Sequence, residues 1–334
     1  MKKLLSLFLA MCTLVALLTG CGASKTADTS AKESNDAKKK TYKVAMIADS
    51  TISDGGWGAA CYNAMVAAAK EKGFETQYTD GLKTADFAQS IRSYADLGYD
   101  LIFAPGNQYS DAVKEVAKDY PDVHFALLNG TIETDNIVSL LPDADQIGQM
   151  AGALAGLMSK TNNIGFIGGM ELDTTKAKLA SYEAAAKVVN PNIKVSAAYA
   201  GSFSDTAKGM EIANSMVTTN NVDVMFGDAS AVDSGARQAL AGHPNTFDIG
   251  QPSDLAKDDK SGVVISSVLT DNATMIKLCM DDIINGKFGK KTIYGNIENG
   301  CLSVGTFSDK VPKDVQAKYL EIVDKIKAGT FVKK

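Results

Sequence analysis

Residues 163–226 read NIGFIGGMELDTTKAKLASYEAAAKVVNPNIKVSAAYAGSFSDTAKGMEIANSMVTTNNVDVMF, and their pattern is the strongest indication of the fold class. Apolar runs at 163–167, 193–199 and 222–226 alternate with segments of helical spacing at 175–189 and 205–217. Short apolar runs joined by helices are typical of strands that are buried on both faces of a parallel sheet. The stretch therefore predicts a βαβαβ unit of the kind that builds Rossmann-like domains.

The same alternation precedes this stretch. Expected strands and helices follow one another at 43–48, 57–70, 74–78, 87–97, 100–104, 110–118 and 123–128, and further strands are expected at 247–250 and 263–268. Two series of about 100 residues each predict an α/β protein with two Rossmann-like lobes, parallel sheets and a hinge. We expect the first lobe at 41–143 plus about 268–310, and the second at about 144–267 plus about 311–334.

The N-terminus has the pattern of a bacterial lipoprotein. A basic start is followed by an apolar run from Leu4 to Leu18, which is shorter than the roughly 20 residues of a membrane-spanning helix. Small residues at the end of such a run indicate a signal peptide at 1–20. Because Cys21 directly follows Leu18-Thr19-Gly20, it is expected to become the lipid-carrying first residue of the mature chain, anchored to the cell membrane outside the cytoplasm. The alternative is a leader that is simply removed.

Residues 21–40 are expected to form a flexible tether. They contain no aromatic and no large aliphatic residue, so they cannot bury enough surface to offset the entropy lost on ordering.

Composition argues against several functions. Without Lys2 and Lys3, 32 basic residues remain against 39 acidic ones, a net charge of −7, and no basic stripe with interleaved aromatic residues indicates a nucleic-acid partner. The two histidines, His124 and His243, have no obvious nucleophile or base beside them in the sequence. We therefore expect no enzyme, no catalytic residues, no metal and no cofactor.

Cys61, Cys279 and Cys301 remain in the body of the chain, without metal-type spacing. We expect buried free thiols, with a Cys279–Cys301 disulfide as the alternative. Gly148, Gly152 and Gly156 recur every four residues, and we expect them to let their helix pack closely on the sheet.

A ligand site is expected at the carboxyl ends of the strands, where ligands bind in open parallel sheets. The segments that follow the strands are 49–58, 105–109, 168–172, 201–205, 227–230, 250–254 and 270–272. They are mostly polar, yet they contain Phe203 and the only tryptophan, Trp57. A flat apolar ligand stacked on these rings would explain them. The alternative is that either ring closes the end of a lobe core.

Three segments carry a family resemblance. Residues 98–117 read GYDLIFAPGNQYSDAVKEVA, residues 158–170 read MSKTNNIGFIGGM, and residues 200–209 read AGSFSDTAKG. Together with the lipoprotein pattern, they resemble the basic membrane protein (BMP) family of substrate-binding lipoproteins, which includes purine nucleoside receptors of ABC importers. The resemblance runs from about residue 41 to the C-terminus. It implies a monomeric two-lobed protein of the type I periplasmic-binding-protein fold that closes around a nucleoside and delivers it to ABC permease subunits.

The resemblance also implies ligand contacts, which fit this chain unevenly. The family's Asp-x-Ser-Phe-Asn corresponds to residues 54–58, so Asp54 and a stacking Trp57 are present, but Gly58 lacks the amide that would bind a base. Phe203 matches the second stacking ring. A family aspartate that would hold ribose hydroxyls is Pro252 here, and a ribose-contacting lysine is Thr270.

Other polar side chains of the same loops complete the expected site. They are Asn107, Asp228, Gln251, Asp254 and Asp271. Either Asp228, Gln251, Asp254 and Asp271 rebuild the sugar site, or the ligand has no ribose, because an unpaired polar group in a closed site costs about 1–3 kcal/mol. A purine nucleoside is the first interpretation, and a free purine base or another flat heterocycle is the second. A ligand sensor with the same fold, or a surface adhesin, are the competing roles.

Overall fold

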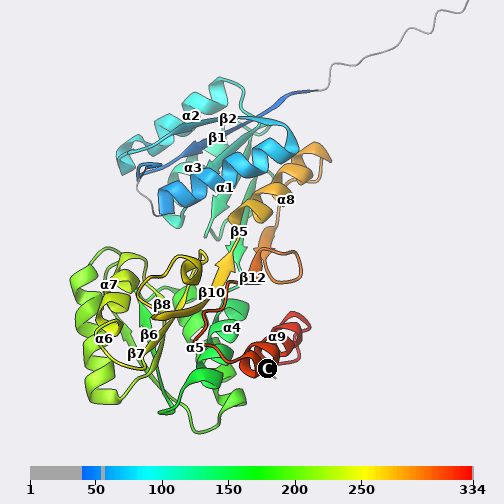
Figure 1. Ribbon diagram of the computed structural model, residues 1–334. Helices are drawn as coiled ribbons and strands as arrows, with labels where there is room; N and C mark the ends of the chain where they lie inside the picture. Colours follow the sequence, from blue (N-terminus) through cyan, green and yellow to red (C-terminus); the bar gives the residue numbers. More distant parts are fainter. Residues whose placement is uncertain (1–39, 54–56, 333–334) are drawn as a thin grey trace, which may run out of the picture. The chain divides into compact units, whose positions relative to one another are not determined.

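The computed structural model describes residues 40–53 and 57–332 (Figure 1). The predictions for the signal peptide, Cys21, most of the tether and Asp54 therefore lie outside the described residues. From Thr41 onward the chain forms one compact unit that contains two six-stranded sheets with helices on both faces. The predicted fold class is confirmed.

The first sheet is parallel throughout and has the strand order β11-β5-β4-β3-β1-β2. Its strands are β1 (Tyr42–Ile47), β2 (Phe74–Thr79), β3 (Leu101–Ala104), β4 (His124–Leu128), β5 (Ile137–Pro142) and β11 (Thr292–Gly295). Its helices are α1 (Trp57–Lys72), α2 (Phe87–Asp96), α3 (Ser110–Ala117) and α8 (Asn272–Ile284), with the 3-10 turns η1 (Thr84–Asp86) and η2 (Asn107–Tyr109).

Alternate residues of a strand point to opposite faces, so each strand of this sheet supplies two cores. In β1, Val44 and Met46 join the core that includes residues of α1 and α8. Ala45 and Ile47 join the core that includes residues of α2 and α3. Both faces are therefore covered, which is why the strand reads as an uninterrupted apolar run in the sequence.

The second sheet has the order β12-β10-β9-β8-β6-β7 and is parallel except for β12, which pairs antiparallel with β10. Its strands are β6 (Asn163–Gly168), β7 (Lys194–Tyr199), β8 (Val224–Asp228), β9 (Phe247–Gly250), β10 (Val264–Thr270) and β12 (Leu302–Val304). Its helices are α4 (Ala144–Met158), α5 (Asp173–Val189), α6 (Thr206–Asn220), α7 (Ala231–Leu240) and α9 (Lys313–Lys327), with the turn η3 (Leu255–Lys257).

Three segments of the chain connect the two sheets, after β5, after β10 and between β11 and β12. Backbone hydrogen bonds tie these crossings to one another: Asp143 N–H donates to the Gly295 carbonyl at 2.8 Å, and Asp271 N–H donates to the Cys301 carbonyl at 2.7 Å. The range 268–310 expected for the first lobe includes β12, whose partner strand β10 belongs to the second sheet.

The three glycines of α4 do not face the sheet as expected but the neighbouring helix α5. The backbone oxygens nearest to a methyl group added at Gly148, Gly152 and Gly156 are those of Lys178, Tyr182 and Ala186, each one turn further along α5. The prediction of close packing holds, and only the partner was wrong. A glycine stripe lets two helix backbones approach each other, whereas the other side of α4 contributes Met150 and Leu154 to the core.

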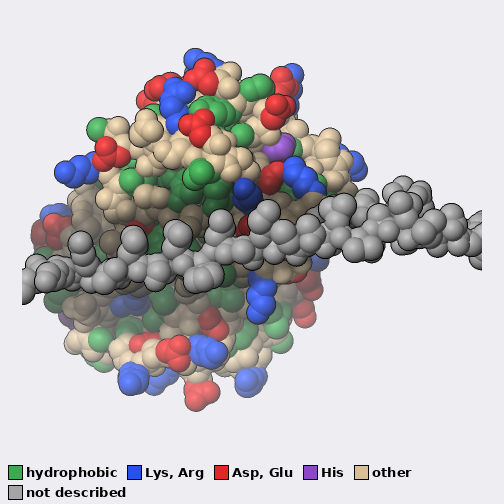
Figure 2. All heavy atoms as spheres, turned by 90° about the horizontal axis from the view of Figure 1, so that it is seen from above, with side chains coloured by type: hydrophobic (Ala, Val, Ile, Leu, Met, Phe, Trp, Pro, Cys, Tyr) green, Lys and Arg blue, Asp and Glu red, His purple; other side chains and the backbone are tan. Residues whose placement is uncertain are grey.

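Cys61, Cys279 and Cys301 are buried free thiols, as expected. Within 40–53 and 57–332 no helix is long and apolar enough to cross a membrane. The same residues contain no cluster of acidic, histidine or cysteine side chains suited to a metal ion. On the face seen in Figure 2, acidic and basic side chains are interspersed.

Candidate functional site

One half of the predicted ligand site, here called the first half-site, lies at the carboxyl ends of β1 and β3 and is centred on Trp57, the first residue of α1. The indole Nε1–H donates to the Pro105 carbonyl, directly after β3, at 2.7 Å. The side chain is partly buried and packs against the core beneath it. Both the N–H group and the apolar surface of the Trp57 ring thus have contacts, and the next residue, Gly58, is buried. This placement fits a fixed platform for a ligand and also the alternative of a ring that closes the core.

A polar network after β1 and β3 was not singled out from the sequence. The Tyr109 hydroxyl donates to the Asp49 carboxylate at 2.9 Å, and Gln108 Nε2 donates to its other oxygen at 3.0 Å. Burial raises the pKa of Tyr109, so its hydroxyl stays protonated. Asn107 is exposed, and its Oδ1 accepts a hydrogen bond from the Ser110 hydroxyl at 2.8 Å. Asp49 lies two residues after the end of β1, and an aspartate just after a strand is the sequence signal that could have identified this network.

The second half-site lies at the carboxyl ends of β6, β7 and β8, and Phe203 is its aromatic residue. The side chain is 42% exposed and is absent from the core clusters. Its ring lies against Gly169, where any side chain would collide with it. The Phe203 carbonyl accepts from Ala231 N–H, at the start of α7, at 3.0 Å. Phe203 is therefore an exposed ring that packs against a glycine.

A polar cluster surrounds Asp228, the last residue of β8. Its carboxylate accepts from Lys178 Nζ at 2.6 Å, from the Thr175 hydroxyl at 2.7 Å and from Gln251 Nε2 at 3.2 Å. The two charged side chains are only 15% and 18% exposed. The structure thus brings the predicted residues Asp228 and Gln251 together. Sequence analysis missed Lys178 and Thr175, because both lie within a helix rather than on a loop after a strand.

The remaining predicted residues bind other parts of the chain. The Asp254 carboxylate accepts from the backbone N–H and the hydroxyl of Thr306, at 2.9 and 2.7 Å. Asp271 caps the start of α8 by accepting from Ala273 N–H at 2.9 Å. Thr270 N–H donates to the Pro252 carbonyl at 2.9 Å, and the Gln251–Pro252 peptide is cis. As ligand contacts, these residues stay predictions.

Two acids of the second lobe are buried, Asp233 in α7 and Asp248 in β9. Asp233 accepts from Ala229 N–H at 2.8 Å, and burial raises its pKa to about 8. Burial also raises the pKa of Asp248 to about 6, although Arg237 opposes this shift from 3.4 Å. We expect these raised pKa values to make the stability of the second sheet depend on pH.

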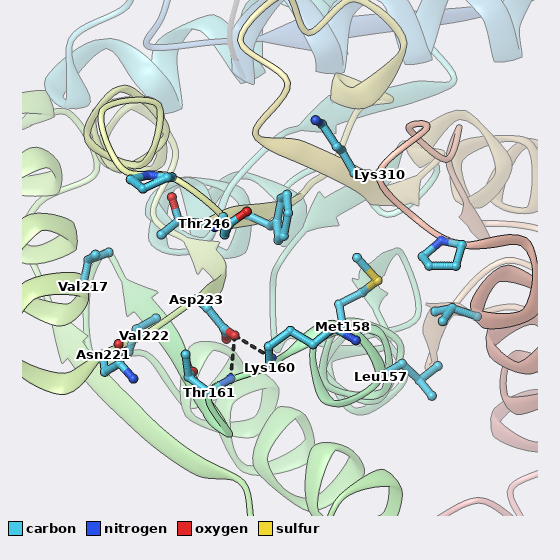
Figure 3. A pocket seen from close by; sticks show the side chains of 15 residues that line it. Leu157, Met158, Lys160, Thr161, Val217, Asn221, Val222, Asp223, Thr246 and Lys310 are labelled. Atoms are coloured by element: carbon cyan, nitrogen blue, oxygen red, sulfur yellow. Dashed lines mark hydrogen bonds between the residues drawn. The ribbon is translucent and has the colours of Figure 1, made fainter.

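A cavity of about 540 Å³ lies elsewhere, at the amino ends of β8 and β9 (Figure 3). Asp223 projects into it, but its carboxylate already accepts from Ser159 Oγ and from the backbone N–H groups of Lys160 and Thr161, at 2.7, 2.6 and 2.9 Å. The acid therefore supports the turn after α4. This cavity is at the end of the sheet opposite to the predicted site.

Comparison with known proteins assigns the chain to a family. A family model described as an ABC transporter substrate-binding protein, PnrA-like, matches residues 41–332. The chain belongs to this Bmp family. The match spans both sheets and both half-sites, and the resemblance seen in the three sequence segments is confirmed.

Individual relatives agree with this assignment. The chain is 32% identical to the ABC transporter nucleoside-binding protein BmpA of Lactococcus lactis, over 87% of this chain and 88% of that protein. It is 29% identical to a CD4+ T-cell-stimulating antigen of Listeria innocua, over 98% and 97%. A solute-binding protein of an ABC transporter from Conexibacter woesei has the same fold, with a TM-score of 0.71 at 24% identity, covering 88% of this chain and 100% of that one. The family is one of solute-binding proteins and not of enzymes.

Proposed function

We propose that this protein is an extracytoplasmic, lipid-anchored receptor that captures a purine nucleoside between two lobes and delivers it to an ABC importer. The observation that carries the ligand class is the 32% identity to a protein named for nucleoside binding. Purine rings are flat and largely apolar on their faces, and stacking on aromatic side chains contributes about 0.5–1.5 kcal/mol beyond burial.

The two aromatic residues support this proposal from opposite half-sites. Trp57 is fixed by its hydrogen bond to Pro105, and Phe203 is exposed beside Gly169. Each lies at the carboxyl ends of parallel strands, where type I binding proteins hold their ligands. Closure of two lobes would bring the rings to the two faces of one base.

The lipid anchor and the membrane location are part of the same proposal. They rest on the Leu18-Thr19-Gly20-Cys21 pattern and on the polar segment 22–40 that follows. Acylation of Cys21 would keep the receptor beside the permease subunits, and the tether would let the body turn toward them.

A free purine base is the second candidate ligand. Pro252 offers no side-chain acceptor and Thr270 no charge at the two positions where the resemblance implies ribose contacts. A sugar that finds no partners would lose the hydrogen bonds it makes with water, which costs affinity. In this case the same stacking residues would bind the base alone.

The test is a thermal unfolding screen with inosine, guanosine, adenosine, hypoxanthine and guanine. A ligand present at 100 times its dissociation constant stabilises the folded state by about 2.7 kcal/mol, which raises the unfolding temperature measurably. Stabilisation by the nucleosides supports the first candidate, and stabilisation by the bases alone supports the second. If none of the five compounds shifts the transition, the purine proposal is wrong.

A further inference from the structure

The acceptors expected to hold sugar hydroxyls are not equally free. Asp254 accepts two hydrogen bonds from Thr306, and Asp271 caps α8. Asp228 accepts from three donors, Lys178, Thr175 and Gln251. A carboxylate that is already surrounded by donors gains little from a ligand hydroxyl. Of the four expected acceptors, this leaves Gln251.

Gln251 and Lys178 retain unused hydrogen-bonding atoms. Both hydrogens of the Gln251 amide are engaged, since Nε2 donates to Asp228 and to the Gly227 carbonyl. Its Oε1 has no hydrogen-bond donor among residues 40–53 and 57–332. Within the same residues, Asp228 is the only acceptor of the Lys178 ammonium, which has three N–H groups. The cluster therefore offers a free acceptor and two free donors.

The two side chains that carry these free atoms meet at one oxygen of Asp228. Lys178 Nζ and Gln251 Nε2 donate to the same oxygen of Asp228, at 2.6 and 3.2 Å. The backbone of Lys178 is held in place by α4, because its carbonyl oxygen packs directly on Gly148. Asp228 thus orients both side chains, and α4 fixes the helix from which Lys178 extends.

This pair of groups matches the chemistry of neighbouring sugar hydroxyls. A hydroxyl can accept from Lys178 while an adjacent hydroxyl donates to Gln251 Oε1. The charge of Lys178 is already balanced by Asp228, so the cluster is neutral overall. A phosphate would bring its negative charge next to the Asp228 carboxylate, which disfavours nucleotides.

We propose that Lys178 and Gln251 form the sugar-hydroxyl site of this receptor and that Asp228 is the residue that positions them. The proposal rests on the proposed function, because it assigns the residues that would bind the ribose of a nucleoside. It also explains how a chain with Pro252 and Thr270 retains a sugar site: the contacts come from α5 and from the residue before the proline.

The experiment compares inosine with hypoxanthine by calorimetry in the full protein. Lys178→Met keeps the length of the side chain and removes the donors, and Gln251→Leu removes the acceptor. Each is expected to weaken inosine binding by about 10- to 100-fold, as for the loss of a hydrogen bond to a sugar. Hypoxanthine binding should change less than about threefold, within the usual scatter of neutral substitutions. Lys176→Met on the same helix is the control, because Lys176 is 52% exposed and pairs with Glu171 at 3.5 Å.

Lys178→Met leaves Asp228 without its cation, so the double variant Lys178→Met/Asp228→Asn restores neutrality and is expected to fold and to retain the loss of inosine binding. Unchanged inosine affinity in folded variants overturns the proposal, and so does an equal loss for inosine and hypoxanthine. If the native protein binds no purine compound but binds uridine or D-ribose in a manner that depends on Lys178, the sugar site stands and the purine assignment fails. If no compound of this set binds, both are overturned.

Discussion

Gly152 allows a direct test of the contact between α4 and α5. A methyl group at this position would lie 2.1 Å from the Tyr182 carbonyl oxygen and 2.7 Å from its carbonyl carbon. Because both are backbone atoms of a helix, neither can turn away, and one helix must shift. Overpacking of this kind costs about 3 kcal/mol at the upper end of its usual range. Glycine to alanine within a helix gains about 1 kcal/mol.

We therefore expect Gly152→Ala to destabilise the protein by about 2 kcal/mol. For a chain of this size, this corresponds to a fall in Tm of about 4 °C, which circular dichroism resolves. Since Lys178 lies one turn before Tyr182 on α5, a shifted helix should also weaken the binding of inosine.

Gly156→Ala is the matched control on the same face of α4. Its nearest neighbour, the Ala186 carbonyl oxygen, would lie 3.0 Å from the new methyl group, and small adjustments relieve that approach. The helix gain and the packing cost should then cancel to within about 0.5 kcal/mol. A Gly152→Ala variant as stable as the native protein would refute the close contact, as would an equal loss in both variants.

Three further predictions address the rings, the buried acids and the anchor. Trp57→Ala should weaken binding of a purine ligand by about 2–3 kcal/mol in calorimetry. Trp57→Phe should lose less affinity because it keeps an aromatic ring, although it lacks the hydrogen bond to Pro105. If Trp57→Ala is partly unfolded but its folded fraction binds normally, the ring is a part of the core. Because the pKa of Asp233 is raised to about 8 in the folded state, the folded protein keeps a proton that the unfolded chain releases near pH 4. The free energy of unfolding should therefore fall from pH 6 to pH 8 by up to about 1.4 kcal/mol per pH unit. Asp233→Asn should flatten this profile in urea unfolding, and an unchanged slope would contradict the raised pKa. Cys21→Ala should abolish lipid labelling, and persistent labelling would exclude Cys21 as the anchor.

The fold could be predicted where a continuous apolar run indicates a strand that is buried on both faces of its sheet. Runs such as 43–48 and 163–167 become β1 and β6 because helices cover both sides of each sheet. The expected strands did not include β5, β11 and β12. The signal is weak for two of them, because β12 has three residues and β11 has an exposed Tyr294 in four, whereas β5 is an apolar and mostly buried run that was overlooked. Short edge strands are defined by their partner rather than by their own sequence.

Candidate site residues could be singled out from the sequence only where they lie just after a strand or at the start of the next helix. Trp57 and Phe203 stand out as aromatic residues in polar segments. Lys178 does not, because a lysine in a helix usually indicates a solvated face. Its place beside Asp228 depends on α5 lying close to α4, and that closeness depends on glycines about thirty residues earlier in the chain. No local pattern contains this information.

The three crossings between the sheets have a practical consequence for engineering. In the third crossing, Glu298 is exposed within a turn whose ends, Asn296 and Asn299, bind each other. Opening the chain at Glu298 would leave two covalent connections between the sheets. Circular permutation or insertion of a fluorescent domain here would therefore preserve both cores. Ile297 N–H donates to Gln146 of α4 at 2.8 Å. A fluorescent domain inserted at Glu298 would therefore be attached to the segment that joins the two sheets, and its signal would follow a movement of this segment.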